Sequence, residues 1–254
     1  MTRTYVVTGA ASGIGRATCE LLARQGHRVV DVDLKDASVV ADLATPEGRT
    51  GLPAAVARAV GDGSVDAVVA NAGVSGPPEL CVRVNYFGAI ATLEGLRPLL
   101  AAAPAPRAVL TASSSVLNQH DDRVVAACLA GDEAAAVAAA PRAGLAAYPS
   151  SKRAVARWLR RAAPSDEWAG AGIALNAVAP GVVETPMTAP LLADEAMRAV
   201  VDEAVPMPFG GLARPEHVAE AIAFLAAPDT VRITGQVLFV DGGADAVLRG
   251  DDIW

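Results

Sequence analysis

Seven short runs rich in Val, Ile and Ala alternate along the chain with longer segments whose apolar residues recur at helical spacing. Strands separated by helices are typical of βαβ units, whose right-handed crossovers place helices on both faces of a parallel sheet. The sequence therefore predicts a doubly wound α/β fold with seven strands. The predicted strands are residues 5–8, 28–33, 39–42, 67–71, 107–112, 173–178 and 237–240.

The length and composition of the chain favour a single domain. The chain has 254 residues, of which 52% are hydrophobic and 19% are charged. An α/β chain of about 250 residues commonly forms one hydrophobic core, and no Ser/Pro-rich linker divides this one. We therefore expect one domain over residues 1–254. Within it, residues 118–147 are rich in Ala and Asp and carry apolar residues at helical spacing, which predicts a helical insert.

The charge and hydropathy of the chain argue against two classes of partner. Lys and Arg number 21 against 28 Asp and Glu, which gives a formal net charge of −7. An acidic surface repels the phosphates of nucleic acids, so we expect no nucleic acid partner. No apolar stretch reaches the roughly 20 residues that cross a bilayer, and we expect no membrane span.

Cysteine usage and the first residues of the chain bear on metal binding and location. Cys19, Cys81 and Cys128 are odd in number and have no CxxC spacing or His partners, so neither a disulfide framework nor a metal site is predicted. The first strand-like run, residues 5–7, begins close to Met1 without a basic lead-in or a small-residue cleavage site. We therefore expect a cytoplasmic protein.

A glycine-rich turn joins the first predicted strand to an amphipathic helix. Residues 8–15 read Thr-Gly-Ala-Ala-Ser-Gly-Ile-Gly. Glycines at such a turn permit close approach of the backbone to a pyrophosphate, and the free N–H groups of the helix N-terminus then stabilise its charge. A tight turn with a purely structural role is the alternative. In this context we interpret Gly9, Ser12, Gly13 and Gly15 as part of a phosphate-binding loop.

An acidic residue at the end of the second strand predicts NAD rather than NADP. Asp33 stands 18 residues after Gly15, where a carboxylate accepts hydrogen bonds from the adenine ribose hydroxyls. A 2′-phosphate would meet this negative charge, and neither Ser12 nor Leu34 supplies a cation to offset it. Asp31 points to the same side of the strand but lies further from its carboxyl end, so we prefer Asp33.

Two further strand ends carry short side chains. Asp42 and Leu43 end the third predicted strand, and Asn71-Ala72-Gly73 end the fourth. Ligands of open parallel sheets lie over the carboxyl ends of the strands. These residues are therefore candidates for contact with a cofactor, and ordinary turn residues are the equal alternative.

Tyr148 and Lys152 are the strongest candidates for catalysis. They stand four residues apart at the start of a predicted helix, so they lie on one face of it. A neighbouring ammonium favours a phenolate and lowers the pKa of the phenol, which makes the pair a usable acid/base. Of the 21 basic residues only Lys35 and Lys152 are lysine, which suggests that an ammonium is specifically needed here.

Hydroxyl and amide side chains complete the predicted catalytic group. Ser113, Ser114 and Ser115 follow the fifth strand, where a hydroxyl can hold a substrate oxygen beside the tyrosine. Asn85 interrupts a helical pattern, and a mid-helix Asn usually has a packing or hydrogen-bonding reason. We consider it a candidate for a water relay behind Lys152.

Taken together, these motifs resemble the short-chain dehydrogenase/reductase family from end to end. The resemblance is carried by Thr-Gly-x-x-x-Gly-x-Gly at 8–15, Asn71-Ala72-Gly73, Asn85, the serines, Tyr148-x-x-x-Lys152 and Pro180-Gly181. It implies a single-domain Rossmann fold and hydride transfer at a nicotinamide cofactor. Tyr148 would be the acid/base, Lys152 would lower its pKa and hold the nicotinamide ribose, a serine would fix the substrate oxygen, and Asn85 would serve the proton relay.

The resemblance also implies which residues hold the cofactor. The pyrophosphate would lie on Gly9, Ser12, Ile14 and Gly15, next to Gly13. The adenosine half would meet Asp33, Leu34, Asp42, Leu43, Asn71, Ala72 and Gly73. The nicotinamide carboxamide would be held by Pro180, Gly181, Val183 and Thr185, beside Tyr148 and Lys152.

Within the family, the chain is similar to the bacterial 3α-hydroxysteroid dehydrogenase/carbonyl reductase subgroup, on residues 33–37, 41–43, 84–89 and 241–247. That resemblance implies an insert before Tyr148, a homodimer, and an apolar secondary alcohol or ketone as substrate, a 3α-hydroxysteroid among the candidates. It places the catalytic serine at Ser113, whereas the family's common pattern of paired serines would choose Ser114. The apolar residues of 187–209 would suit a large substrate or simply pack two ordinary helices.

Other interpretations stand beside an NAD-dependent alcohol dehydrogenase. Coniferyl or terpene-type alcohols are alternative substrates within the subgroup. A dinucleotide-sensing regulator would keep the glycine loop but would not need Tyr148 and Lys152, and a fold alone never establishes activity. An interaction module built on the insert is a third reading, although symmetric self-association is the commoner use of such a surface.

Overall fold

The computed structural model describes residues 2–61 and 63–251, so Met1, residue 62 and residues 252–254 of the predicted domain 1–254 lie outside the described residues. Seven parallel strands form one sheet in the order β3-β2-β1-β4-β5-β6-β7. This confirms the predicted seven-stranded Rossmann fold. The strands are β1 (Thr4–Thr8), β2 (Arg28–Asp33), β3 (Val39–Val40), β4 (Ala67–Ala70), β5 (Arg107–Thr111), β6 (Ala174–Pro180) and β7 (Val237–Val240).

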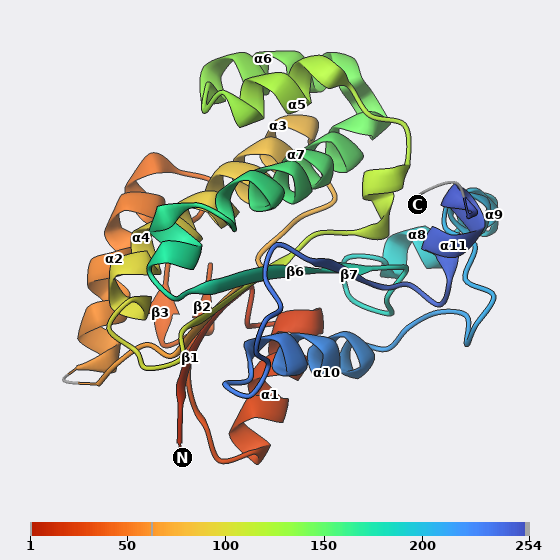
Figure 1. The fold of residues 1–254 in the computed structure, drawn as a ribbon. Coiled ribbons are helices and arrows are strands. Elements are labelled where there is room, and N and C mark those ends of the chain that lie inside the picture. The colour runs from red at the N-terminus through yellow and green to blue at the C-terminus, as the bar shows by residue number, and fades with distance from the viewer. Residues whose placement is uncertain (1, 62, 252–254) are drawn as a thin grey trace.

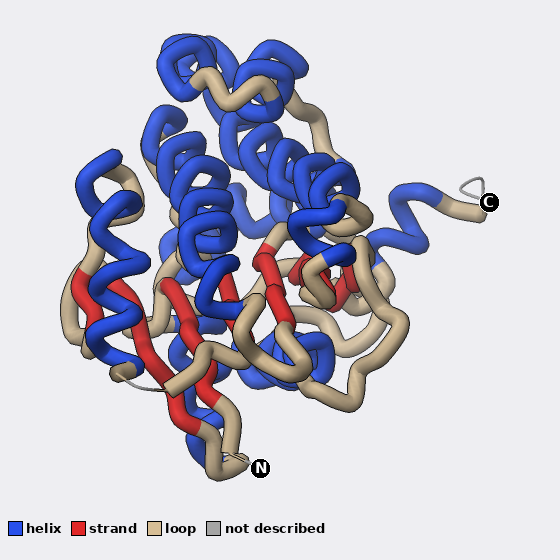
Figure 2. The backbone as a smooth tube through the Cα atoms, turned by 60° about the vertical axis from the view of Figure 1, so that its left-hand side comes forward, coloured by secondary structure: helices blue, strands red, loops and turns tan. Residues whose placement is uncertain are grey.

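Helices cover both faces of the sheet (Figure 1). One face carries α1 (Gly13–Arg24) and α10 (Pro215–Ala226), and the other carries α2 (Pro46–Val60), α4 (Ala89–Leu100) and α7 (Ala147–Ala162). The tube view likewise shows the strands as one layer with helices on either side (Figure 2). The remaining helices are α3 (Pro78–Leu80), α5 (Asp122–Leu129), α6 (Glu133–Ala143), α8 (Ala189–Ala193), α9 (Glu195–Ala204) and α11 (Ala244–Arg249).

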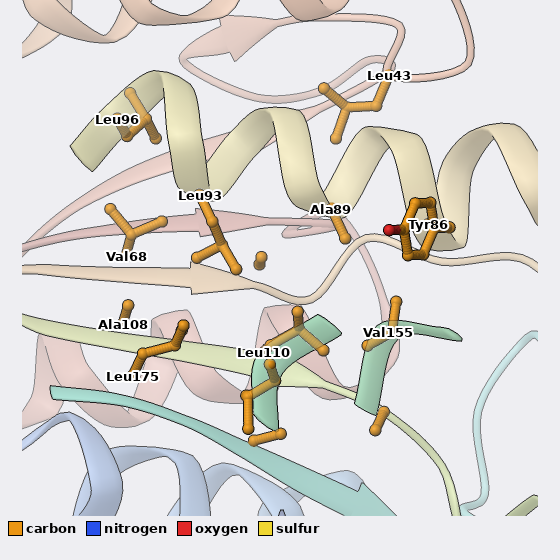
Figure 3. Packing of buried hydrophobic residues seen from close by; sticks show 14 of the residues in the cluster. Leu43, Val68, Tyr86, Ala89, Leu93, Leu96, Ala108, Leu110, Val155 and Leu175 are labelled. Carbon is orange, nitrogen blue, oxygen red and sulfur yellow. The ribbon is translucent and has the colours of Figure 1, made fainter. Parts of the chain in front are cut away.

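The strands are buried on both faces because apolar residues alternate between two cores. On β4, Val68 belongs to the larger cluster and Val69 to the cluster under α1 and α10. In the larger cluster, Leu93 and Leu96 of α4 pack over Val68 and the neighbouring strands (Figure 3). Burial on both faces is what a parallel sheet with helices on each side requires.

Four predicted strands end elsewhere than expected: the fourth and fifth stop one residue early, at Ala70 and Thr111, and the third and sixth differ by two residues. The third stops at Val40 rather than Asp42, because Asp42 begins a turn: its side chain accepts a hydrogen bond from the Ala44 N–H (2.9 Å) and its carbonyl accepts from the Thr45 N–H (3.2 Å). The sixth continues to Pro180, which pairs with Val240 on β7.

The segment before Tyr148 forms two antiparallel helices, α5 and α6, that lie over α7 and α3 (Figure 1). Each helix begins at an aspartate whose side chain accepts a backbone N–H of the first turn: Asp121 for α5 and Asp132 for α6. The apolar faces of α5 and α6 join the larger core through Val124, Cys128 and Ala136. The segment is therefore folded onto the rest of the protein.

Candidate active site

A cavity of about 530 Å³ lies over the carboxyl ends of β1, β2, β4, β5 and β6. This is the edge at which open parallel sheets bind ligands. Most of the predicted site residues line it: Gly9, Ser12, Gly13, Ile14, Asp33, Leu34, Asp42, Leu43, Asn71, Ala72, Gly73, Ser113, Tyr148, Lys152, Pro180, Gly181, Val183 and Thr185. Gly15, Asn85 and Ser114 are the predicted residues outside this lining.

The glycine turn between β1 and α1 forms a cradle that larger side chains would fill. Gly9 has φ +69°, and a Cβ there would lie 2.8 Å from the Cα of Ala72. A Cβ on Gly15 would collide with the Gly9 carbonyl oxygen, so Gly15 shapes the turn from beneath the cavity. No side chain caps the start of α1 at Ser12, which leaves the first N–H groups of the helix free for an anion. The cradle fits a pyrophosphate.

Asp33 reaches the cavity from the end of β2. Its two carboxylate oxygens accept hydrogen bonds from the backbone N–H groups of Ala11 (2.9 Å) and Leu34 (2.7 Å). These bonds fix the orientation of the carboxylate and leave lone pairs for a further donor. Asp31 instead binds the backbone N–H and the hydroxyl of Ser38 and is not in the cavity lining.

Asn71 ties the floor of the cavity together at the centre of the sheet. Its Nδ2 donates to the Thr8 carbonyl of β1 (3.1 Å), and its Oδ1 accepts from the Thr111 hydroxyl of β5 (3.1 Å). The Asn71 side chain therefore holds the three strand ends β1, β4 and β5 at a fixed distance beneath the cavity.

Tyr148 and Lys152 lie one turn apart on α7, with the Lys152 Nζ 5.9 Å from the centroid of the Tyr148 ring. Lys152 is only 4% exposed, and its ammonium donates a hydrogen bond to the Thr111 carbonyl (2.8 Å) at the end of β5. Burial disfavours the charged form and lowers the pKa of Lys152 to about 8.

Burial raises the pKa of the Tyr148 phenol above its ordinary value, and the Ser113 side chain acts in the opposite direction. The expectation that the Lys152 ammonium lowers the pKa of Tyr148 thus meets an opposing influence, because the same burial makes both ions unfavourable. The effect of Lys152 on the phenol stays a prediction.

Ser113 and Ser114 occupy different environments. Ser113 lines the cavity, and its Oγ accepts a hydrogen bond from the Ser115 N–H (3.2 Å), so its own proton can be donated to the Tyr148 phenol or to a substrate oxygen. Ser114 is 2% exposed in the 3₁₀ turn Ser114–Leu117 and lies outside the cavity lining. Of the two, Ser113 has the better geometry for holding a substrate oxygen.

Asn85 lies in a π-helical segment, Cys81–Gly88, that joins α3 to α4. Its Oδ1 accepts from the Val74 N–H (2.8 Å), and its Nδ2 donates to the Val74 carbonyl (3.0 Å) and to the Ser151 hydroxyl (3.1 Å). The irregularity that the sequence shows at Asn85 corresponds to this wide turn, which often occurs at functional sites. The side chain holds the loop after β4 and reaches α7, without a direct bond to Lys152 among the hydrogen bonds of the described residues.

Sequence reasoning missed the residue that holds the lysine. Thr111 ends β5, and its carbonyl accepts the Lys152 ammonium while its hydroxyl binds Asn71. Its position near the end of a predicted strand, just before the serines, is the sequence feature that could have identified Thr111 as a site residue. Pro186, Met187 and Thr188, which precede α8, close the far side of the cavity.

The part of the chain that the structure describes holds neither a cluster of metal ligands nor a helix fit to cross a membrane. No three His, Cys, Asp or Glu side chains gather there as metal ligands would. None of the helices in residues 2–61 and 63–251 combines the length and apolar character that crossing a membrane requires.

Comparison with known proteins places this site in context. A family model described as enoyl-(acyl carrier protein) reductase, of the short-chain dehydrogenase/reductase type, matches residues 9–245. The chain is 38% identical over 255 residues to the 3-alpha-hydroxysteroid dehydrogenase/carbonyl reductase of Comamonas testosteroni, covering 96% of this chain and 97% of that protein. It is 37% identical over 262 residues to the cis-4-hydroxycyclohexanecarboxylate dehydrogenase of Sinomonas cyclohexanicum, again covering 96% and 97%.

A solved structure agrees with these sequence relatives. The 3-alpha-hydroxysteroid dehydrogenase from Pseudomonas sp. B-0831, complexed with NADH, superimposes with a TM-score of 0.91 at 44% identity, covering 98% of this chain and 99% of that one. Fold, site geometry and relatives over nearly the whole length lead to one conclusion: the chain belongs to the short-chain dehydrogenase/reductase family of oxidoreductases.

Proposed function

We propose that the protein is an NAD-dependent oxidoreductase that interconverts a secondary alcohol and a ketone on an apolar substrate, with a 3α-hydroxysteroid as the leading candidate. The observation that carries the proposal is the convergence of Tyr148, Lys152 and Ser113 in one cavity whose other end is the glycine cradle. An acid/base and a cofactor cradle in one cavity are what dehydrogenation of an alcohol requires.

The residues present fit a nicotinamide dinucleotide. The adenosine half would lie on Asp33, Leu34, Asp42 and Leu43, the pyrophosphate on the turn from Gly9 to Ile14, and the nicotinamide on Pro180, Gly181, Val183 and Thr185. Asp33 carries a negative charge where NADP would place its 2′-phosphate, and the similar Pseudomonas enzyme was solved with NADH. Both observations support NAD.

The chemistry divides between cofactor and protein. A bound nicotinamide would accept the hydride of the alcohol carbon, or supply it to a ketone. The Ser113 hydroxyl donates a hydrogen bond to the substrate oxygen and so orients that oxygen toward the Tyr148 phenol. Tyr148 takes the hydroxyl proton as the alcohol is oxidised and returns it in the reverse direction. The Lys152 ammonium, fixed by the Thr111 carbonyl, favours the phenolate form of Tyr148 that accepts this proton.

The cavity lining supports an uncharged substrate. The lining includes the apolar residues Val74, Leu80, Val84, Pro186 and Met187, and Lys152 is the only Lys or Arg among all described lining residues. A carboxylate substrate, such as the Sinomonas enzyme's name indicates for that protein, would find no guanidinium there. The relatives give no preference to coniferyl or terpene-type alcohols, or to a sensor without activity.

Assembly and location belong to the same proposal. We infer a homodimer, because the resemblance to the hydroxysteroid dehydrogenase subgroup implies one, and we keep the expectation of a cytoplasmic location. Sedimentation velocity at micromolar concentration is expected to give about twice the mass of the 25.7 kDa chain. A single species at the mass of one chain would contradict the dimer.

Replacing Tyr148 by Phe tests the mechanism. The variant keeps the ring but loses the group that moves the proton, so turnover of alcohol with NAD is expected to fall by at least about 10²-fold. NAD affinity, measured by fluorescence titration, should stay close to wild type. Tyr5→Phe is the matched control, because Tyr5 is buried in β1 away from the cavity lining, and it should keep full activity. Retained turnover in Tyr148→Phe would overturn the mechanism.

A further inference from the structure

The hydroxyl of Ser151 joins the two elements that carry the proposed catalytic residues. Ser151 is fully buried on α7, between Tyr148 and Lys152 in the sequence. Its Oγ donates to the Tyr148 carbonyl (2.7 Å) and accepts from the Nδ2 of Asn85 (3.1 Å). These bonds connect the first turn of α7 directly to the π-helical segment Cys81–Gly88.

The Asn85 amide has its geometry fixed by this bond. Its Oδ1 and one Nδ2 hydrogen are used by the backbone of Val74, and its second Nδ2 hydrogen goes to Ser151. An amide nitrogen has only two hydrogens, so the Val74 carbonyl and the Ser151 hydroxyl together use the whole donor capacity of the Asn85 Nδ2. Without the Ser151 hydroxyl, a buried N–H of Asn85 would lose its acceptor, which is unfavourable at a site closed to water.

The side chains of Asn85 and Lys152 both approach Gly73. A Cβ built on Gly73 would lie 3.2 Å from the Asn85 Oδ1 and 3.3 Å from the Lys152 Nζ. The space around the ammonium is therefore bounded by Gly73 and by the amide that Ser151 holds. A rotation of Asn85 would change the access of water to Lys152, although the Ser151 side chain itself lies outside the cavity lining.

We propose that Ser151 is a positioning residue of this active site: its hydroxyl fixes Asn85 against α7 and thereby holds the closed environment of the Lys152 ammonium beside Tyr148. The catalytic part of this inference rests on the proposed alcohol oxidoreductase function. Ser151 can fix Asn85 in this way without contacting substrate or cofactor.

The preceding residue offers a matched control. Ser150 is also fully buried in the first turn of α7, and its Oγ donates to the Ala146 carbonyl (2.7 Å). It accepts a hydrogen bond from the Asp121 N–H (2.8 Å) at the start of α5, so it joins α7 to the insert rather than to Asn85. Ser150→Ala and Ser151→Ala remove the same atoms from the same helical turn.

The kinetic test compares these two variants. In Ser151→Ala, kcat for alcohol oxidation is expected to fall about tenfold, the effect of losing one hydrogen bond that matters in the transition state. KM for the alcohol and Kd for NAD should remain within about twofold, because neither ligand touches Ser151. Ser150→Ala should keep kcat while losing a similar amount of thermal stability. Equal kcat in the two variants would overturn the proposal.

A second measurement does not depend on turnover. Lys35 and Lys152 are the only lysines of the chain, so protein grown on [ε-¹³C]lysine shows one signal from the exposed Lys35 and one from the buried Lys152. Lys152 faces two titratable side chains, Tyr148 and Cys81, and both are unchanged in the variants. In Ser151→Ala the pH titration of the Lys152 signal should move upward from about 8, because water gains access. The titration of the Lys152 signal should not move in Ser150→Ala, and the Lys35 signal should be unchanged in both variants.

The two measurements separate the positioning role from the proposed function. A shifted Lys152 titration without any alcohol turnover in wild type would reject the function and keep the link between Ser151 and Lys152. An unshifted titration in Ser151→Ala would overturn the proposal, whatever the activity. If Ser151→Ala does not fold, Ser151→Cys, whose thiol is a weak hydrogen-bonding group, should fold and show a smaller shift in the same direction.

Discussion

At the scale of single residues, Asp33 sets the proposed preference for NAD. Its carboxylate is held by the Ala11 and Leu34 N–H groups, so it cannot easily swing away from a 2′-phosphate. Neither Ser12 nor Leu34, the cavity residues nearest to it in the glycine turn and after β2, carries a positive charge. Discrimination should therefore depend on repulsion from Asp33 and on its hydrogen bonds to ribose hydroxyls.

Replacing Asp33 by Ser is expected to shift the cofactor preference toward NADP. The ratio of kcat/KM with NAD to kcat/KM with NADP should fall about 10- to 100-fold, the range for hydrogen bonds to a charged group. Asp31→Ser is the control, because Asp31 binds Ser38 outside the cavity lining. A ratio that moves with Asp31 rather than Asp33 would show that the wrong carboxylate has been assigned.

Lys152 should make the free protein more stable as the pH rises. Its pKa is about 8 in the folded state, lowered by burial from the ordinary value of 10.5. Between these values the unfolded chain binds more protons than the folded one, so stability increases with pH. Below pH 8 Lys152 is protonated in both the folded and the unfolded chain, and the cost of burying its ammonium lowers the free energy of unfolding to the full extent.

Lys152→Met tests this sign by chemical denaturation without cofactor. At pH 7 the variant lacks the destabilising buried charge of wild type. The difference in free energy of unfolding between variant and wild type should therefore move in favour of wild type by about 2 to 3 kcal/mol between pH 7 and pH 10. Lys35→Met, at an exposed position, should show no such change with pH. A constant difference between Lys152→Met and wild type from pH 7 to pH 10 would mean that Lys152 is not destabilised by burial.

At the scale of elements, one carboxylate anchors the insert to the segment that carries Asn85. Glu133, the first residue of α6, pairs through Oε2 with the Arg49 Nη2 of α2 (2.5 Å) and through Oε1 with the Arg83 Nη1 of the π-helical segment (3.0 Å). The Arg49 side chain is 9% exposed and the Glu133 side chain 25%. Arg49 also donates to the Arg83 carbonyl (3.5 Å), so α2, α6 and the π-helical segment meet at this carboxylate.

Glu133→Gln should therefore destabilise the protein by about 1 to 3 kcal/mol, because it leaves the largely buried Arg49 without a counter-charge. Urea denaturation at pH 7 measures the change. Glu20→Gln removes an exposed i,i+4 pair with Arg16 and should alter stability by less than about 1 kcal/mol. If the two variants lose equal stability, α6 is not held through Glu133.

The elements show how far a sequence can predict this structure. Alternating β-branched runs and helical periodicity correctly predicted the seven strands, because a buried strand or helix imposes its period on the apolar residues. The predicted end of the third strand at Asp42 was wrong: the strand stops at Val40, because the turn at Asp42 depends on side-chain hydrogen bonds. The π-helical segment was visible only as an unexplained Asn85 within a helical pattern.

At the scale of the whole molecule, the carboxyl edge of the sheet gathers residues that are far apart in the chain. Gly9, Asp33, Ser113 and Tyr148 were predictable because each follows a strand or begins a helix at that edge. The bond between Asn85 and Ser151 joins residues 66 positions apart, and the pKa values of Tyr148 and Lys152 depend on burial by several elements. Neither follows from local pattern, because both arise from packing in three dimensions.

The measurement that tests the central claim most directly is the initial rate of reduced nicotinamide formation by the purified protein. NAD is compared with NADP over a panel of 3α-hydroxysteroids, coniferyl alcohol, cyclic terpene alcohols and a carboxylated cyclohexanol. We expect turnover of an uncharged apolar secondary alcohol with NAD, a kcat/KM with NADP at least about tenfold lower, and turnover at least about 10²-fold lower in Tyr148→Phe. Turnover with NADP alone, or of the carboxylated alcohol alone, would contradict the account.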